Sequence, residues 1–150
     1  MEISISESEI INKALDILEE KLHYGESVVF NSSEIAKNYC KLKLRSLKNE
    51  HFAVLFLDKR HRLIEYSELF HGTIDCSSVH PRVVAQKALE VNAAAVIFAH
   101  NHPSGFAEPS HADQQITNQL KNALSMFDVR VLDHLVVGED VVSFAERRLI

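Results

Sequence analysis

The hydrophobic and polar positions of the chain follow two periods, and the first half predicts two helices and a hairpin. Residues 7–22 place apolar side chains at helical spacing, and a serine pair begins a second helix over about 32–42. The apolar run 51–58 is rich in strand-forming residues, "KRHR" turns the chain, and residues 63–72 return as a second strand. A short polar turn between two such runs predicts a β-hairpin.

The second half of the chain alternates helices and strands. Ser77 or Ser78 can cap a helix that has Pro81 in its first turn. The later predicted elements are a strand, a helix and two paired strands, over residues 94–100, 111–126, 129–138 and 139–144. The first of these strands is apolar on both faces, which predicts a central strand covered on both sides. The order α-α-β-β-α-β-α-β-β predicts an α/β fold with a mixed, partly antiparallel central sheet flanked by helices.

Composition and charge narrow the functional class. A chain of 150 residues with 46% hydrophobic and 25% charged residues predicts one globular domain. Its net charge of −5 argues against a dedicated nucleic-acid binder, which carries an excess of Lys and Arg. A basic run within residues 37–48 is interpreted as the solvated face of a helix.

A cytoplasmic protein is predicted from the N-terminal sequence, the short apolar runs and the two cysteines. The start "MEISISESEI" lacks the basic and apolar regions of a signal peptide. The longest apolar run, at 93–99, is too short to span a bilayer, so we expect no membrane association. Cys40 and Cys76 form no motif that suggests a disulfide framework.

Candidate metal ligands follow the predicted central strand, in the stretch "HNHPSGFAEPSHAD" at residues 100–113. His100 and His102 are two residues apart at the end of a strand, so both side chains point to one face. The chain has seven Gly and Pro residues in all, and three of them (Pro103, Gly105 and Pro109) lie in 103–109, which predicts a loop of fixed shape. Asp113 lies in the first turn of the next helix. Two imidazoles and one carboxylate predict a zinc site with an open fourth position, as in catalytic zinc sites.

Each part of this motif also has other interpretations. Ser110-x-x-Asp113 has the spacing of a helix capping box, and a His-x-His pair arises by chance in a chain with nine histidines. His-x-His followed by a Glu such as Glu108 begins a cupin site, but helices between the strands disfavour a cupin barrel. A metallo-β-lactamase site needs His-x-His-x-Asp-His, and "PSG" follows here instead.

The spacing His-x-His-x7-Ser-x-x-Asp is that of the JAMM motif of MPN-plus metalloproteases. The strings "HNHPSG" and "PSHAD", together with "FAVLFLD", "GTID" and "LDHLVVG", closely resemble the JAB domain of RadC-like proteins over about residues 8–150. The resemblance implies a cytidine deaminase-like, JAB/MPN architecture. It divides the single domain 1–150 into an N-terminal helical part, 1–45, and a zinc-binding core, 46–150. The chain resembles a short form of the family, without the N-terminal helix-hairpin-helix region that RadC proteins commonly carry.

The resemblance also implies roles for individual residues. His100, His102 and Asp113 match the ligands of one zinc ion per chain, and Ser110 matches a serine whose hydroxyl supports the oxyanion. Glu50, just before the first long strand, matches the catalytic glutamate.

Some assignments stay open on the residues alone. Glu50 competes with Glu65 and Glu68 for the role of general base, and the choice rests on the resemblance. Asp133 and His134 match a RadC feature. They are either buried structural residues, the interpretation favoured here, or residues that contact and orient the metal ligands. We expect His51, beside Glu50, to be a surface residue.

The resemblance implies a zinc metallopeptidase that hydrolyses peptide or isopeptide bonds. A zinc-activated water attacks the amide, and Glu50 acts as general base. The alternative is a non-enzymatic or DNA-repair-associated partner module of RadC type. The acidic net charge leads us to expect no direct nucleic-acid binding, and neither the substrate nor the oligomeric state is indicated.

Overall fold

A computed structural model describes residues 6–23, 28–72 and 78–150. The predictions that concern Cys76, Ser77 and the part of "GTID" after Gly72 lie outside the described residues. The elements are α1 (Glu7–His23), α2 (Ser33–Leu44), β1 (His51–Leu57), β2 (Leu63–His71), α3 (Pro81–Glu90), β3 (Ala95–Asn101), α4 (His111–Ser125), β4 (Arg130–Val137) and β5 (Val141–Ser143). This order of helices and strands confirms the predicted one.

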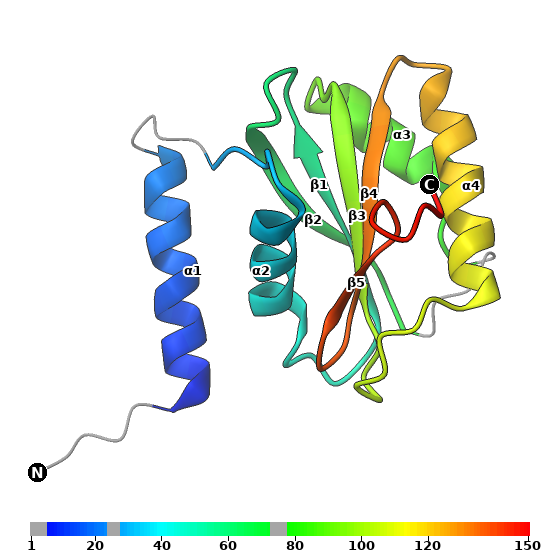
Figure 1. Cartoon of the computed structure of the whole chain (residues 1–150). Coiled ribbons are helices and arrows are strands. Elements are labelled where there is room, and N and C mark those ends of the chain that lie inside the picture. The colour runs from blue at the N-terminus through cyan, green and yellow to red at the C-terminus, as the bar shows by residue number, and fades with distance from the viewer. Residues whose placement is uncertain (1–5, 24–27, 73–77) are drawn as a thin grey trace, which may run out of the picture.

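The strands form one five-stranded sheet in the order β2-β1-β3-β4-β5. Strands β3 and β4 are parallel and are joined through α4, whereas the other neighbouring pairs are antiparallel. The predicted mixed α/β fold is therefore confirmed. Figure 1 shows α1 and α2 on one side of the sheet and α3 and α4 on the other.

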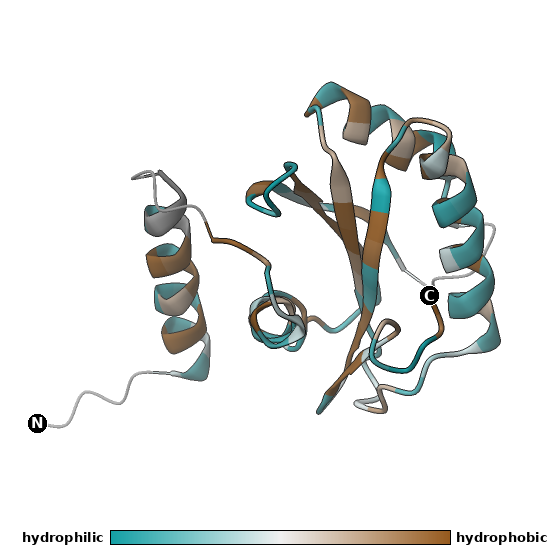
Figure 2. Cartoon of the chain, turned by 45° about the horizontal axis from the view of Figure 1, so that its top comes forward, coloured by the Kyte–Doolittle hydropathy of each residue, from teal (hydrophilic) through white to brown (hydrophobic). Residues whose placement is uncertain are grey.

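Alternating side chains of the strands divide the core into two layers. Figure 2 shows the hydrophobic strands enclosed between the helices. The strand residues that pack toward α2 are Ala53, Leu55, Leu57, Ala95, Ile97, Ala99, Leu135 and Val137. Those that pack toward α3 and α4 are Phe52, Val54, Phe56, Val96 and Phe98. Every residue of β3 is buried, as predicted for a strand covered on both sides.

The helix ends match the sequence signals in part. Ser32 caps α2 by accepting a hydrogen bond from the backbone of Ile35, and Pro81 begins α3 as predicted. The N-cap of α3 is His80, not a serine, and its side chain makes no capping hydrogen bond. The chain must already be extended before Pro81, and this places the helix start after Ser78.

Helix α1 is only partly packed. Leu18 contacts the core layer on the α2 side, but Ile10 and Ile17 are 56% and 49% exposed. In Figure 1, α1 lies outside α2 rather than against the sheet. Among the described residues, the helices are too short or too polar to cross a membrane.

Candidate metal centre

The end of β3 and the start of α4 bring His100, His102 and Asp113 together. The Nε2 atoms of His100 and His102 are 3.0 Å apart. The Asp113 carboxylate places Oδ1 3.1 Å from His100 Nε2 and Oδ2 3.4 Å from His102 Nε2. These three side chains are one of two groups with metal-binding potential among the described residues.

Asp113 serves the helix and this cluster at once. Its backbone N–H donates to Ser110 Oγ over 3.1 Å, and its Oδ2 accepts from the Ser110 backbone N–H over 2.7 Å. The capping box that the spacing allowed is therefore present, and it fixes the carboxylate. Burial by itself would raise the pKa of Asp113. Without a metal ion, hydrogen bonds from the Nε2 atoms of His100 and His102, when these carry a hydrogen, hold that pKa well below its usual range.

A chain of hydrogen bonds behind His100 sets the tautomer of its ring. Thr117 donates from Oγ1 to the Asp113 carbonyl over 2.6 Å, so the 2.5 Å contact with His134 Nδ1 must use a hydrogen on that nitrogen. Burial holds the pKa of His134 well below its usual value, so the ring is neutral and its Nε2 keeps a lone pair. This Nε2 lies 2.8 Å from His100 Nδ1, which therefore donates. The lone pair of His100 is left on Nε2, directed at Asp113 and His102.

The loop after β3 orients His102 in the same way. His102 Nδ1 lies 2.9 Å from the carbonyl oxygen of Phe106 and must donate to it, which leaves the Nε2 lone pair toward the cluster. Without a metal ion, a proton on Nε2 would hydrogen-bond to Asp113, and this is the main reason that the pKa of His102 is raised, against the effect of burial. The carbonyl of Phe106 and the negative charges of Asp113 and Glu50 raise it further.

Two glycines hold this loop against the β4–β5 turn. The backbone N–H of Glu139 donates to the carbonyl of Gly105 over 2.8 Å. A Cβ on Gly138 would lie 2.3 Å from that same carbonyl oxygen, so only glycine fits there. Gly105 itself has φ +87°, a conformation that favours glycine. The loop shape expected from its Pro and Gly content thus depends on a close approach of two backbone segments.

Glu50 lies on the same face of the sheet as the cluster. In the antiparallel pairing of β1 and β3, Phe52 is opposite His100. Continued for two residues beyond the paired strands, this register would place Glu50 opposite His102, and the charge of Glu50 contributes to the raised pKa of that imidazole. The two rival glutamates lie elsewhere: Glu65 forms an ion pair with Lys87, and Glu68 contacts His51.

Asn101, between the two histidines, points to the opposite face and fixes the segment that carries Glu50. Its Oδ1 accepts from the backbone N–H of His51 over 2.7 Å. Its Nδ2 donates to the carbonyls of Leu47 and Asn49 over 3.3 and 3.0 Å. One amide side chain therefore joins the end of β3 to the start of β1.

Asp133 and His134 differ in what they contact. Asp133 accepts hydrogen bonds from the backbone N–H groups of His134 and Ala145 and from the Ser143 hydroxyl, so it ties β4 to the C-terminal turn. This matches the structural interpretation of Asp133. His134 is also buried, but it contacts His100 directly, and this favours the other interpretation, in which it orients a candidate metal ligand.

Thr117 and Asn101 were not among the functional residues that the sequence predicted. A signal for Thr117 existed, because it lies four residues after Asp113 on the buried face of α4, where the neighbours are apolar. His51 was expected at the surface, but its side chain is only 18% exposed.

Comparisons with known proteins confirm the resemblance seen in the motifs. A model of the RadC-like JAB domain matches residues 30–149. A UPF0758 protein of Vibrio cholerae is 57% identical over 141 residues, covering 94% of this chain and 88% of that protein. A UPF0758 protein of Leptothrix cholodnii is 59% identical over 123 residues, covering 81% of this chain but 55% of that protein. The chain thus spans most of the first relative and about half the length of the second.

Proposed function

The chain belongs to the RadC-like JAB domain family, and from this premise we propose that it is a zinc-dependent hydrolase of peptide or isopeptide bonds. One observation carries the proposal. Two imidazole Nε2 lone pairs and a carboxylate converge on one point, and each imidazole is oriented from behind by a hydrogen bond from its Nδ1. Three acceptors around one point favour a cation between them.

The donor set fits zinc. Two imidazoles and one carboxylate are the protein ligands of many catalytic zinc sites, in which the fourth position is open. Ligand atoms about 2.0–2.1 Å from a tetrahedral zinc lie about 3.3 Å from one another. The two imidazole Nε2 atoms are 3.0 Å apart, and the Asp113 carboxylate lies 3.1 Å from His100 through Oδ1 and 3.4 Å from His102 through Oδ2. His100, His102 and Asp113 would hold the ion. When bound, zinc supplies Lewis acidity and a water with a lowered pKa.

The protein's own groups would move protons and stabilise charge. Glu50 would accept a proton from the attacking water and transfer it to the leaving amine. The Ser110 oxygen accepts from the Asp113 N–H, so its hydroxyl hydrogen is free to donate to the developing oxyanion. Ser110 is exposed, as a residue that meets substrate must be.

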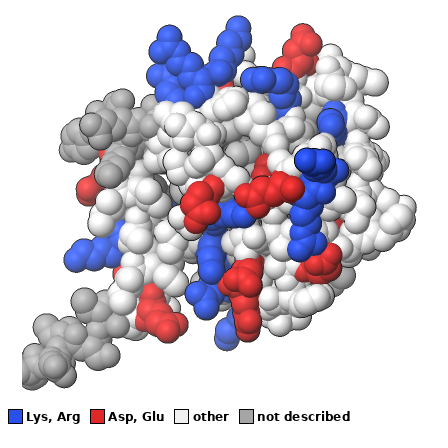
Figure 3. Space-filling view, in the orientation of Figure 1, with Lys and Arg blue, Asp and Glu red and all other residues white. Residues whose placement is uncertain are grey.

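We do not propose direct nucleic-acid binding. Figure 3 shows acidic and basic side chains interspersed over the middle of one face, with basic groups also at its upper edge. Several cations are paired, since Lys37 contacts Glu146 and Arg147 binds Glu108 through two contacts of 2.7 and 2.9 Å. On the face that Figure 3 shows, such pairing interrupts the positive surface that phosphate binding uses.

The test is hydrolysis by metal-free and metal-loaded protein. We expect cleavage from a library of peptides and lysine-linked isopeptides to be lost on chelation and restored by Zn²⁺ but not by Mg²⁺. The matched control is Glu50→Gln, which should bind zinc without cleaving. Zinc-loaded wild type with no more cleavage than this variant across the library would contradict the proposal.

A further inference from the structure

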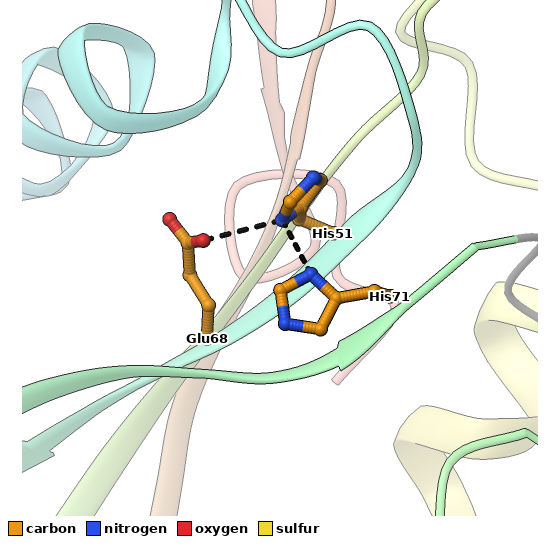
Figure 4. A group of neighbouring side chains, drawn as sticks. All are labelled: His51, Glu68 and His71. Atoms are coloured by element: carbon orange, nitrogen blue, oxygen red, sulfur yellow. Dashed lines mark hydrogen bonds and ion pairs between the residues drawn. The ribbon is translucent and has the colours of Figure 1, made fainter.

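A second histidine–carboxylate cluster lies on the opposite face of the sheet. It consists of His51, Glu68 and His71, from the paired ends of β1 and β2 (Figure 4). His51 Nδ1 lies 2.8 Å from His71 Nδ1 and 3.2 Å from Glu68 Oε2. These residues are on the α2 side of the sheet, because His51 alternates with Phe52 on β1.

A β-bulge creates this cluster. His51 is opposite His71 and Phe52 is opposite Phe70, but Ala53 is opposite Glu68 because the register shifts by one residue. Without the shift, Leu69 would lie opposite Ala53 and Glu68 would point to the other face. The bulge therefore brings a carboxylate to the same side as the two imidazoles.

Hydrogen bonds among the three side chains do not satisfy them all. If His71 Nδ1 donates to His51 Nδ1, then the lone pair of His51 is occupied and Glu68 faces that nitrogen with no hydrogen between them. If His51 Nδ1 carries the hydrogen instead, one N–H must serve both the carboxylate and the His71 lone pair. A cation between the three atoms satisfies every lone pair at once.

The cluster is also supported from behind. Tyr66 donates to Glu68 Oε1 over 3.1 Å, which leaves Oε2 toward His51. The backbone N–H of His51 is held by Asn101. Hydrogen bonds of this kind orient metal ligands in proteins.

We propose that His51, Glu68 and His71 form a second binding site for Zn²⁺ or a similar divalent transition metal ion. Two imidazoles and one carboxylate favour such an ion over Mg²⁺ or Ca²⁺, which prefer oxygen ligands. His51 and Glu68 are 18% and 28% exposed and His71 is exposed, so an ion has access and room for water ligands. The ion would link β1 to β2 one residue from Glu50. This proposal does not depend on hydrolase activity.

The experiment counts metal ions in matched variants. Metal-free protein is equilibrated with Zn²⁺, the bound ion is measured, and Co²⁺ absorption reports the ligand environment. We expect two ions in wild type, one in His102→Ala, one in His71→Ala or Glu68→Gln, and none when His102→Ala is combined with His71→Ala. Loss of a ligand should weaken the affected site by more than the roughly 10- to 100-fold typical of an outer-shell change.

The controls are Glu65→Gln and His80→Ala. Glu65 lies on the same strand as Glu68 but pairs with Lys87 of α3, and His80 is an exposed histidine close to Phe70. Both should keep two ions. In the His102→Ala background, Zn²⁺ should also raise the midpoint of thermal unfolding, and His71→Ala should abolish that rise.

Two results would overturn the proposal. One is a single ion in wild type that His102→Ala removes and His71→Ala leaves in place. The other is a second ion that persists in both His71→Ala and Glu68→Gln, because it would be bound elsewhere. His71→Ala and Glu68→Gln alter no residue assigned to the buried cluster, so their result stands apart from the test of hydrolysis.

Discussion

The two histidine–carboxylate clusters lie at the same end of the strands, on opposite faces of the sheet, and are built differently. In the first, His100 and Asp113 are only 1% and 3% exposed, and a relay through His134 and Thr117 fixes the ring of His100. In the second, each side chain is partly open to solvent, and the orienting contacts among the described residues are the Tyr66 hydroxyl on Glu68 and the Asn101 amide on the backbone of His51.

This difference predicts different roles. Burial excludes water and strengthens every electrostatic interaction within a site, and fixed tautomers spare the ligands any rearrangement on metal binding. The buried cluster is therefore suited to tight metal binding and to chemistry. The open cluster is suited to weaker binding that joins two strands. Convergence of ligands is common to both, so the surrounding groups decide what each one does.

The largest expected effect separates the two clusters by their metal. Asp113→Ala removes the carboxylate of the buried cluster, so we expect that cluster to lose most of its zinc and the protein to lose its hydrolysis. The open cluster should keep its ion. Metal analysis beside circular dichroism checks this, because the loss of the capping box also weakens α4. Asp140→Ala, at an exposed aspartate outside both clusters, is the control. Equal zinc in the Asp113→Ala variant and wild type would remove Asp113 from the ligand set.

Glu50→Gln tests whether Glu50, which directly precedes β1, is the general base of the buried cluster. Gln keeps the size of Glu but does not accept a proton at neutral pH, so we expect zinc content and folding to remain. Turnover should fall by about 10²-fold or more. Glu65→Gln and Glu68→Gln are the comparators, since sequence alone left these three residues in competition. Full activity in Glu50→Gln with a large loss in Glu68→Gln would transfer the role of base to the opposite face.

Ser110→Ala separates catalysis from capping at the buried cluster. Loss of an oxyanion donor typically costs about 10²–10³ in turnover, whereas loss of a helix cap costs about 1 kcal/mol of stability. Zinc should remain. The matched control is Ser32→Ala, which removes the cap of α2 far from the metal and should lower stability alone. If both variants lose stability and neither loses turnover, Ser110 is only a cap.

The fold was predictable because its signals are local. An apolar run rich in strand-forming residues marked β1, its return after a polar turn marked β2, and a second apolar run marked β3 as a central strand. The motif at 100–113 was equally local, so a single short stretch identified His100, His102 and Asp113 as neighbours. Helix α1 shows the limit of periodicity, because its apolar stripe includes Ile10 and Ile17, which the structure leaves exposed.

The rest depends on register and on contacts between distant segments. Glu68 joins His51 only because a bulge shifts β2 by one residue, and no turn residue marks that bulge in the sequence. Asn101 acts on a segment about 50 residues earlier in the chain. The relay to His100 needs α4 and β4 to pack together, so Thr117 gained a role only once the elements were assembled.

The smallest effect, and the most specific test of why the two clusters differ, concerns that relay. Thr117→Val keeps the shape of the side chain but removes the hydroxyl, so His134 Nδ1–H loses its acceptor. The tautomer of His134 with its hydrogen on Nε2 then becomes more favourable. In that tautomer His134 Nε2 would donate to His100 Nδ1, and His100 would carry its own hydrogen on Nε2. That nitrogen is the one directed at the metal, so zinc affinity of the buried cluster should fall by about 10- to 100-fold.

Thr117→Ser is the rescue, because it restores a hydroxyl at the same place and should return zinc affinity toward wild type. Competition with a chelator measures the affinity, and imidazole nitrogen NMR reports which ring nitrogen carries hydrogen. Stability alone does not decide the question, since an unsatisfied buried donor costs about 1–3 kcal/mol whatever the metal does. A Thr117→Val protein that is less stable but binds zinc as tightly as Thr117→Ser would show that the relay only packs the core. The preference of the buried cluster for metal would then rest on its burial and on Asp113 rather than on a preset tautomer.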